Sequence, residues 1–374
     1  MPSATRIGPL AMIALSAVLG GGPVAGQTKV DSSVLWESYS FDGAVPYGEI
    51  SELSLPVSAS FALGTAGELA VSTAYVRVLL SLDEDGAPVE HLLSGLADTE
   101  ARLTLNIIRD RLVFLTTASI PTGIESLEGG QQDVLNVLVT DVLGFYTQRL
   151  GSGGSIGGGL AGALPLGRLA FGFAGSYTAF GSFQPLVGGQ EVKPGGEIRF
   201  RGGVEGTVAE DTYLRAALIL GIRANDQLAG EDLPGLGDRV GGYLSVDQGV
   251  GSSTLSLYVF DLFRSDPQIG ESAFGSPLPR GNLLAAGARL TIPVTREGRL
   301  TPRLEWRRSD RAPDPLSGDL QELGSALRFG ADFSTRLAPG ADLILQGDGL
   351  FGSVEGGVAD VSGYRIGATI AITR

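Results

Sequence analysis

The chain of 374 residues contains no cysteine, one histidine and only two lysines, Lys29 and Lys193. Without cysteine, neither disulfide bonds nor thiolate metal sites can form. Beyond residue 26 no run of 18 apolar residues occurs, so the sequence offers no helix that could span a membrane. Acidic residues number 41 against 27 basic ones, a net charge of −14. This balance argues against a nucleic-acid partner, because phosphates require a positive surface.

Residues 1–26 have the pattern of a secretory signal peptide. Arg6 supplies the positive charge, a short apolar stretch follows, and small residues precede a cleavage site before Gln27. The alternative is a buried N-terminal helix. We therefore expect an exported protein whose single domain spans residues 27–374, because no Pro-rich linker and no change of pattern divides it.

An alternation of apolar with polar or small side chains recurs along the whole of 27–374. It is clearest in 299–307, where Leu300, Leu304 and Trp306 share one face of an extended chain and Arg299, Arg303, Glu305 and Arg307 share the other. Successive side chains of a strand point to opposite sides. In a soluble β-sandwich the apolar face would meet a core, whereas in an outer-membrane barrel it would meet lipid and the ionic face would line a lumen.

The alternation and the turn signals predict sixteen strands, with fourteen as the alternative count. The predicted strands lie near 33–41, 48–63, 67–82, 99–108, 111–120, 153–165, 168–180, 195–208, 210–223, 239–248, 252–264, 281–294, 298–308, 323–337, 340–352 and 358–373. Connections of one to three residues alternate with long ones at 83–98, 121–152, 181–194, 224–238, 265–280 and 309–322. This favours an all-β fold, a closed antiparallel transmembrane barrel with short periplasmic turns and long extracellular loops, over a soluble β-protein.

The charged faces of these strands supply the candidate lumen-facing residues. They are Arg102, Asn106, Arg199, Arg201, Arg215, Arg303, Glu305, Arg307, Arg328, Asp342, Asp348 and Arg365. One interpretation is a set of Arg–carboxylate pairs across neighbouring strands that stiffens the wall. The other is an excess of arginine that gives the pore a preference for anions.

The long connection 121–152 carries a pattern of its own. Val134, Leu135, Leu138 and Val142 recur at i, i+1, i+4 and i+8, on one side of a helix. Such a helix either packs at the surface on neighbouring loops or folds into the barrel mouth and narrows the pore. In the second case, this segment is a constriction loop.

Catalytic and metal-binding patterns are sparse. The histidine, His91, lies near Glu90, Ser94 and Asp98, but no nucleophile is recognisable beside it. Gly153-Gly154-Ser155-Ile156-Gly157 matches G-x-S-x-G in letters without the strand–turn–helix context of that motif. No calcium-loop motif accompanies the acidic clusters. We expect no catalytic residue, no cofactor and no metal.

Several short motifs resemble a family of outer-membrane barrel proteins associated with transport, some of them tied to phenol meta-pathway degradation. These motifs are Gly95-Leu96-Ala97-Asp98-Thr99-Glu100-Ala101-Arg102, Ile120-Pro121-Thr122-Gly123, Gly151-Ser152-Gly153, Pro194-Gly195-Gly196-Glu197 and Gly363-Tyr364-Arg365. The resemblance runs over most of 27–374. It implies an outer-membrane barrel with a transport role, and it carries no catalytic residues.

The sequence therefore predicts an outer-membrane channel or transporter for small solutes in a Gram-negative-type bacterium. The alternatives are a non-conducting structural or surface-interaction barrel and an outer-membrane hydrolase that uses His91. The expected partners are outer-membrane lipid, a small-molecule solute and, during biogenesis, the barrel-assembly machinery. The solute and the oligomeric state are left open by the sequence.

Overall fold

The protein is described by a computed structural model that covers residues 27–84, 87–147, 150–233, 238–264, 281–311 and 322–374. The predicted signal peptide, residues 1–26, lies outside the described residues. No helix in the described part of the chain has the length and apolarity needed to cross a membrane.

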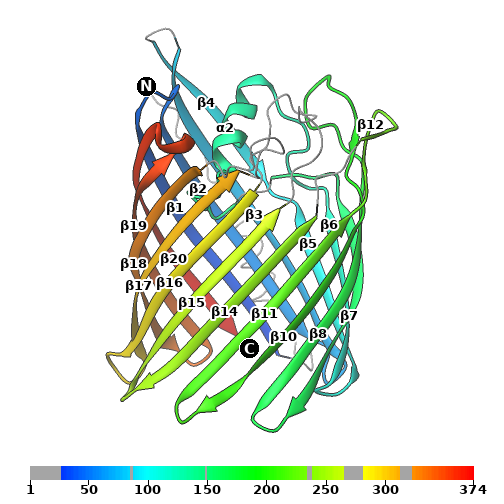
Figure 1. Cartoon of the computed structure of the whole chain (residues 1–374), viewed down its shortest axis with the longest axis vertical. Coiled ribbons are helices and arrows are strands. Elements are labelled where there is room, and N and C mark those ends of the chain that lie inside the picture. Colours follow the sequence, from blue (N-terminus) through cyan, green and yellow to red (C-terminus); the bar gives the residue numbers. More distant parts are fainter. Residues whose placement is uncertain (1–26, 85–86, 148–149, 234–237, 265–280, 312–321) are drawn as a thin grey trace.

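The described chain forms one closed antiparallel β-barrel (Figure 1). Each wall strand pairs with the next along the chain, and β20 returns to pair with β1. The wall has sixteen strand positions, which confirms the predicted count of sixteen over fourteen. The wall strands are β1 (Thr28–Gly43), β2 (Tyr47–Ala62), β3 (Gly67–Glu84), β5 (Thr99–Ile108), β6 (Leu112–Ile120), β7 (Ser155–Leu166), β8 (Leu169–Phe180), β10 (Glu197–Ala209), β11 (Thr212–Arg223), β14 (Arg239–Val250), β15 (Ser253–Arg264), β16 (Gly281–Pro293), β17 (Gly298–Arg311), β18 (Glu322–Ala338), β19 (Ala341–Val354) and β20 (Ala359–Thr373).

Tight turns join the strands at one end of the barrel, which we call the turn rim (bottom of Figure 1). Asp110 and Asp211 adopt φ values of 59° and 57° in two of these turns. Asp is one of the few residues besides Gly that tolerates this left-handed conformation, because its short side chain can bond to the nearby backbone. The short connections of the sequence therefore meet at one rim, as two-stranded hairpins require.

The outer surface of the wall is apolar. Leu218, Ile156 and Ile366 expose 69%, 65% and 52% of their surfaces, and many other Leu, Ile, Val and Phe residues along the strands are similarly exposed. Opposed residues of an antiparallel pair share a face. Because Ile366 opposes Trp36 across β20 and β1, the two side chains lie on the same outer side. The alternation predicted from the sequence therefore places the apolar sides outward.

The opposite end of the barrel, which we call the mouth rim, carries the longer connections (Figure 1). A three-stranded sheet of β9 (Val192–Lys193), β12 (Asp226–Leu228) and β13 (Glu231–Leu233) forms within two of them. The short 3-10 helix η1 (Glu355–Gly357) joins β19 to β20. The predicted connections 265–280 and 309–322 lie largely outside the described residues.

The prediction of a loop over 83–98 is wrong. Residues Ala87–Leu96 form a strand, β4, which pairs with the upper half of β3 and extends that hairpin above the wall (Figure 1). The lower half of β3 pairs with β5, so β4 and β5 share one position in the barrel. Leu93 is buried while Leu92 is exposed. This strand alternation is masked in the sequence by the acidic and glycine residues around it.

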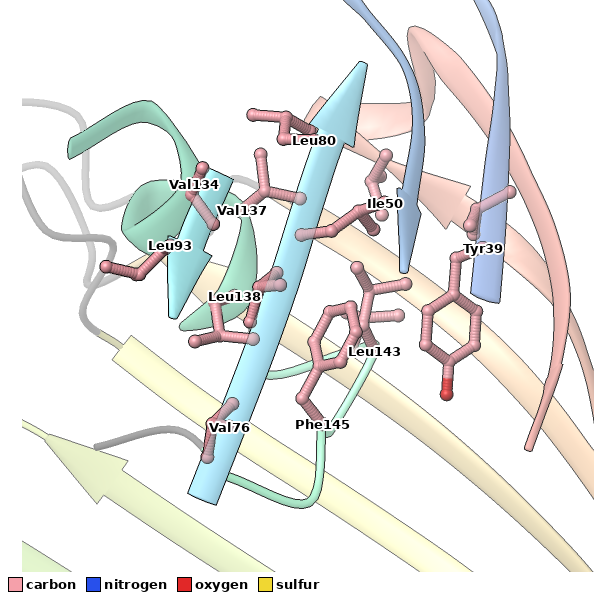
Figure 2. Packing of buried hydrophobic residues seen from close by; sticks show 14 of the residues in the cluster. Tyr39, Ile50, Val76, Leu80, Leu93, Val134, Val137, Leu138, Leu143 and Phe145 are labelled. Atoms are coloured by element: carbon pink, nitrogen blue, oxygen red, sulfur yellow. The ribbon is translucent and has the colours of Figure 1, made fainter. Parts of the chain in front are cut away.

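A buried apolar cluster lies inside the barrel near the mouth rim, and we call it the mouth cluster. It joins side chains of β1, β2, β3, β4, β18, β19 and β20 to side chains of the segment 121–154. Figure 2 shows Leu138, Leu143 and Phe145 of this segment packed beside Val76 and Tyr39 of the wall. The longest connection therefore packs against the inner wall instead of extending away from it.

Candidate functional site

The segment 121–154 begins with an ordered turn and the helix α2 (Gly129–Leu138). The helix starts with a capping box: Gln131 accepts a bond from the Glu128 backbone N–H at 3.0 Å, and the Glu128 side chain bonds in return to the backbone of Gln131. These reciprocal bonds satisfy two N–H groups that the first turn leaves without helical partners. The sequence thus fixes where the helix begins.

The helical face predicted from the sequence is formed only in part. Val134 and Leu138 are fully buried, and Leu135 packs at the edge of the mouth cluster. Val142 does not belong to the helix, because α2 ends at Leu138. It is nevertheless only 1% exposed, since the chain beyond the helix turns into the same cluster. The prediction of one helical face through Val142 is therefore wrong, although Val134, Leu138 and Val142 are all buried in the mouth cluster.

The helix packs on the inner side of the β3–β4 hairpin. Leu80 of β3 and Leu93 of β4 are both fully buried in the mouth cluster with Val134 (Figure 2). The Nδ1 atom of His91 lies 3.3 Å from Asp133 on the helix. A Cβ atom at Gly130 would meet the imidazole ring, so glycine permits this close approach.

Beyond the helix, residues 141–147 run along the inner wall, and we call them the strap. Two arginines bind consecutive backbone carbonyls of the strap. Arg328 of β18 donates to the carbonyl of Leu143, and Arg365 of β20 donates to the carbonyl of Gly144 at 2.7 Å. These charge-assisted bonds hold the chain at a point where it has no secondary structure to bind its own carbonyls.

Two glutamates bind consecutive backbone amides on the same strap. The amide of Tyr146 donates to Glu37 of β1 at 2.9 Å, and the amide of Thr147 donates to Glu52 of β2 at 3.2 Å. Glu37 also accepts bonds from Arg365 at 2.6 Å and from the Tyr39 hydroxyl at 2.8 Å. The strap is therefore held by opposite charges on four strands.

Two further contacts position the first half of the strap. Asp141 forms an ion pair with Arg264 of β15. Gly144 adopts φ of 56°, and a Cβ atom there would meet the guanidinium of Arg307. Only glycine meets both demands at low cost, because other residues strain in this conformation and would displace the arginine.

The candidate lumen-facing residues fall into three groups. Arg328, Arg365 and Arg307 contact the strap, as described. Ion pairs on the wall join Arg303 to Asp348 and Asp332, Arg199 to Glu197, Arg215 to Glu205 and Asp342 to Arg336, and Arg307 also pairs with Glu305. Arg102 and Arg201 form no ion pair within the described residues, and Asn106 donates to the Thr65 carbonyl at 3.0 Å near the turn rim. A pore-lining role for this set stays a prediction.

Two cavities open beside the segment 121–154. The first, of about 310 Å³, lies against β1 to β8, and we call it the carboxylate cavity because Asp31, Asp98 and Glu100 line it. The second, of about 360 Å³, lies between the segment and the wall of β8, β10, β11 and β14. We call it the arginine cavity, after Arg199, Arg223 and Arg239. Both are lined by Ser152 and Phe180, so the cavities adjoin there.

His91 is not assembled with the polar residues that follow it in the sequence. His91 opposes buried Leu80 and faces inward, whereas Ser94 opposes Arg77 on the outer side of the same strand. Asp98 instead accepts bonds from the Gly123 amide at 3.1 Å and from Ser152 at 3.0 Å. Ser155 is the first residue of β7, so the G-x-S-x-G letters mark the start of a strand. The described residues hold no group of three or more potential metal ligands.

Sequence reasoning missed Glu37 and Glu52 as strap ligands. Both residues are 0% exposed. Their strands did carry a signal, because Glu37 lies on one face with Leu35 and Tyr39, and Glu52 lies on one face with Ile50. A charge on such a face requires a partner. The partner lies about a hundred residues further along the chain, at positions that no local pattern marks.

No protein-family model and no curated protein matches the chain. Among solved structures, it is similar to Pseudomonas aeruginosa OpdQ, with 10% identity, a TM-score of 0.46, and coverage of 94% of this chain and 99% of that one. It is also similar to Acinetobacter baumannii OccAB3, with 9% identity, a TM-score of 0.46 and coverage of 94% and 99%. It is similar as well to the outer membrane protein OprD from Pseudomonas aeruginosa, with 10% identity, a TM-score of 0.45, and coverage of 93% of this chain and 94% of that one. Likenesses this distant assign no function.

Proposed function

We propose that the protein is an outer-membrane channel for small solutes, in which the strap and α2 narrow the passage through the barrel. The single observation that carries this proposal is the arrangement of side chains on the wall, which is the reverse of that in a soluble protein. Apolar residues such as Leu218 cover the outside, while charged residues such as Arg303 and Asp348 lie on the inside. A closed barrel with this polarity suits a bilayer around it and water within it.

The strap supports a constriction because it lies within the barrel and is bound along one side of the inner wall. It follows the wall from β15 through β18 and β20 to β1 and β2, through Asp141, Leu143, Gly144, Tyr146 and Thr147. The arginine cavity remains between the segment 121–154 and the facing wall of β8 to β14. In this proposal, a solute that crosses the barrel passes on the side of the arginine cavity.

Planar-bilayer recording tests the proposal with a matched pair of variants. Arg328→Met removes the donor to the Leu143 carbonyl, and Arg336→Met removes an exposed arginine on the same face of the same strand at the turn rim. We expect stable single-channel currents from the wild type, a larger conductance for Arg328→Met as the strap loosens, and wild-type conductance for Arg336→Met.

A second candidate function is a non-conducting structural barrel, which the extensive packing of 121–154 within the mouth cluster favours. Correctly folded protein of all three forms would then insert into bilayers and pass no current. Heat-modifiability on electrophoresis checks that each form is folded. An absence of current then means that the folded barrel does not conduct. Loss of current in every folded form would overturn the channel proposal.

A further inference from the structure

His91 is the only histidine of the chain, and it lies where the segment 121–154 meets the β3–β4 hairpin. It opposes the fully buried Leu80 of β3, so its ring points to the side on which α2 packs. The ring contacts the first turn of the helix, because a Cβ atom at Gly130 would come within 2.9 Å of three ring atoms. Histidine is the side chain whose charge ordinarily changes between about pH 5 and 8. A contact at this place can therefore respond to protons.

The Nδ1 atom of His91 lies close to a carboxylate without bonding to it. It is 3.3 Å from an oxygen of Asp133, on the same side of α2 as Gly130. The atom is buried, yet within the described residues it has no hydrogen-bond partner. Protonation places an N–H on Nδ1, whichever ring nitrogen carried the first proton. The close approach would then become a charge-assisted hydrogen bond, which is stronger than a bond between neutral groups.

The charged groups around the ring favour its protonated form. Asp133 is the one charged residue of α2, and Glu128, which precedes the helix, places a carboxylate at the positive end of the helix dipole. Glu90 points to the opposite face of β4, and β3 presents the uncharged Leu80. Within the described residues, none of the three acids pairs with an arginine or lysine. Burial of the ring acts in the opposite sense, but part of its surface keeps contact with water, so the adjacent carboxylate has the larger effect.

The helix is connected directly to the strap. It ends at Leu138, and the strap begins three residues later at Asp141. Val134, next to Asp133, belongs with Leu93 of β4 to the mouth cluster (Figure 2). The hairpin, the helix and the strap are therefore packed in continuity. A change in how firmly the hairpin holds α2 would alter the position of the strap within the barrel.

We propose that His91 and Asp133 form a proton-dependent latch, which holds α2 against the β3–β4 hairpin more firmly in acid than in neutral solution. The docked helix brings a carboxylate to the ring, so docking and proton uptake reinforce each other. The added stability is present while the ring is charged and is lost as the pH rises and the ring becomes neutral. This inference concerns the regulation of the proposed constriction and rests on the proposed function for its effect on current. The hold on the helix can be measured without any current, so the two proposals can fail separately.

Amide hydrogen exchange of the folded protein in lipid vesicles measures this hold. After correction for the intrinsic exchange rate at each pH, the protection of the α2 amides reports how often the helix opens locally. We expect this protection to be at least about threefold higher at about pH 5.5 than at about pH 8, which is the effect of one partly exposed ion pair. The amides of β16 are the internal reference, because this wall strand contributes no residue to the mouth cluster. Their protection should be equal at the two pH values.

Variants identify the two partners of the latch. His91→Asn and Asp133→Asn each remove one partner, so α2 should be protected equally at the two pH values in both variants. Glu90→Gln is the matched control, because it removes the neighbouring acid on the opposite face of β4. Its protection should depend on pH as in the wild type. A merely structural role for His91 would lower the protection of α2 at both pH values and leave their ratio as in the wild type.

The overturning results are equally specific. Equal protection of α2 at the two pH values in the wild type, or higher protection at the higher pH, contradicts the latch. A pH dependence that persists in His91→Asn or Asp133→Asn, or that disappears in Glu90→Gln, does the same. A conducting protein that fails these tests keeps the proposed function and loses only the latch. A pH-dependent hold in a protein that never conducts keeps the latch and loses the channel.

Discussion

Glu37 on β1 and Glu52 on β2 oppose one another across an antiparallel strand pair, and both side chains are completely buried. Two buried carboxylates in register would ordinarily repel. Here each receives a backbone N–H of the strap, from Tyr146 and from Thr147. Of the two, Glu37 alone has an arginine partner within the described residues, Arg365, at 2.6 Å. The strap thus supplies part of the hydrogen bonding that lets both acids stay in the wall.

The two acids are expected to respond differently to amide substitution. Glu37→Gln removes the charge that pairs with buried Arg365 and should destabilise the folded barrel by about 3 kcal/mol, because it leaves an uncompensated cation. Glu52→Gln keeps an acceptor for the Thr147 amide while removing a carboxylate with one unbonded oxygen, so stability should be unchanged or higher. Urea unfolding in lipid vesicles measures both. Equal losses for the two variants would contradict the different pairing of these acids.

Gly144 is expected to be the least replaceable residue of the strap. Gly144→Ala imposes a strained left-handed conformation and drives a methyl group into Arg307, so we expect a loss of at least about 2 kcal/mol of stability. Gly188→Ala is the control, because Gly188 has φ of 73° with no atom near its Cβ position. In that variant the free energy of unfolding should fall only by the cost of the left-handed backbone conformation, about 1 kcal/mol. Similar unfolding midpoints for the two variants would show that the strap does not approach Arg307 closely.

A positive charge on the outside should reveal where hydrocarbon surrounds the barrel. Leu218→Arg, at the most exposed apolar side chain of β11, should cost about 2–4 kcal/mol if this surface faces the bilayer centre. Leu337→Arg, beside a tight turn at the turn rim, should cost no more than about 1 kcal/mol. The free energies of unfolding of the two variants are to be compared in lipid vesicles. A mild effect at Leu218 would argue against a lipid-covered wall.

The paired charges inside the wall predict a further contrast. Arg303→Gln removes the arginine partner of Asp332 and of the buried Asp348. We therefore expect the free energy of unfolding to fall by about 3 kcal/mol. Arg102→Gln, at an exposed position without an ion pair in the described structure, should change stability by less than about 0.5 kcal/mol. If Arg303→Gln were as mild as Arg102→Gln, the Arg–carboxylate ladder would not stiffen the wall.

The strands could be predicted because their signal is local. In 299–307, Leu304 and Trp306 alternate with Arg303 and Glu305, and the structure places the first pair outside and the second inside. Such alternation requires nothing beyond the geometry of an extended chain. It fails at Ala87–Leu96, where a strand pairs only with the extended end of β3 and borders a helix instead of the wall.

The strap could not be predicted, because its contacts join residues that are far apart in the chain. Arg328 and Leu143 are 185 residues apart, and Glu37 and Tyr146 are 109 apart. The helical period in 121–152 predicted an apolar helical face at Val134 and Leu138, but not the surface against which both are buried. The direction of the chain after Leu138 depends on Gly144 and on charges from four strands, which only the closed barrel brings together.

The most direct test of the central claim is the single-channel conductance of a variant that lacks residues 126–148, relative to the wild type. The deletion removes α2 and the strap but no wall strand. If these residues narrow an aqueous passage, the folded variant should conduct distinctly more than the wild type in the same bilayer and salt. An unchanged conductance, in a variant shown to be folded by heat-modifiability, would contradict the account.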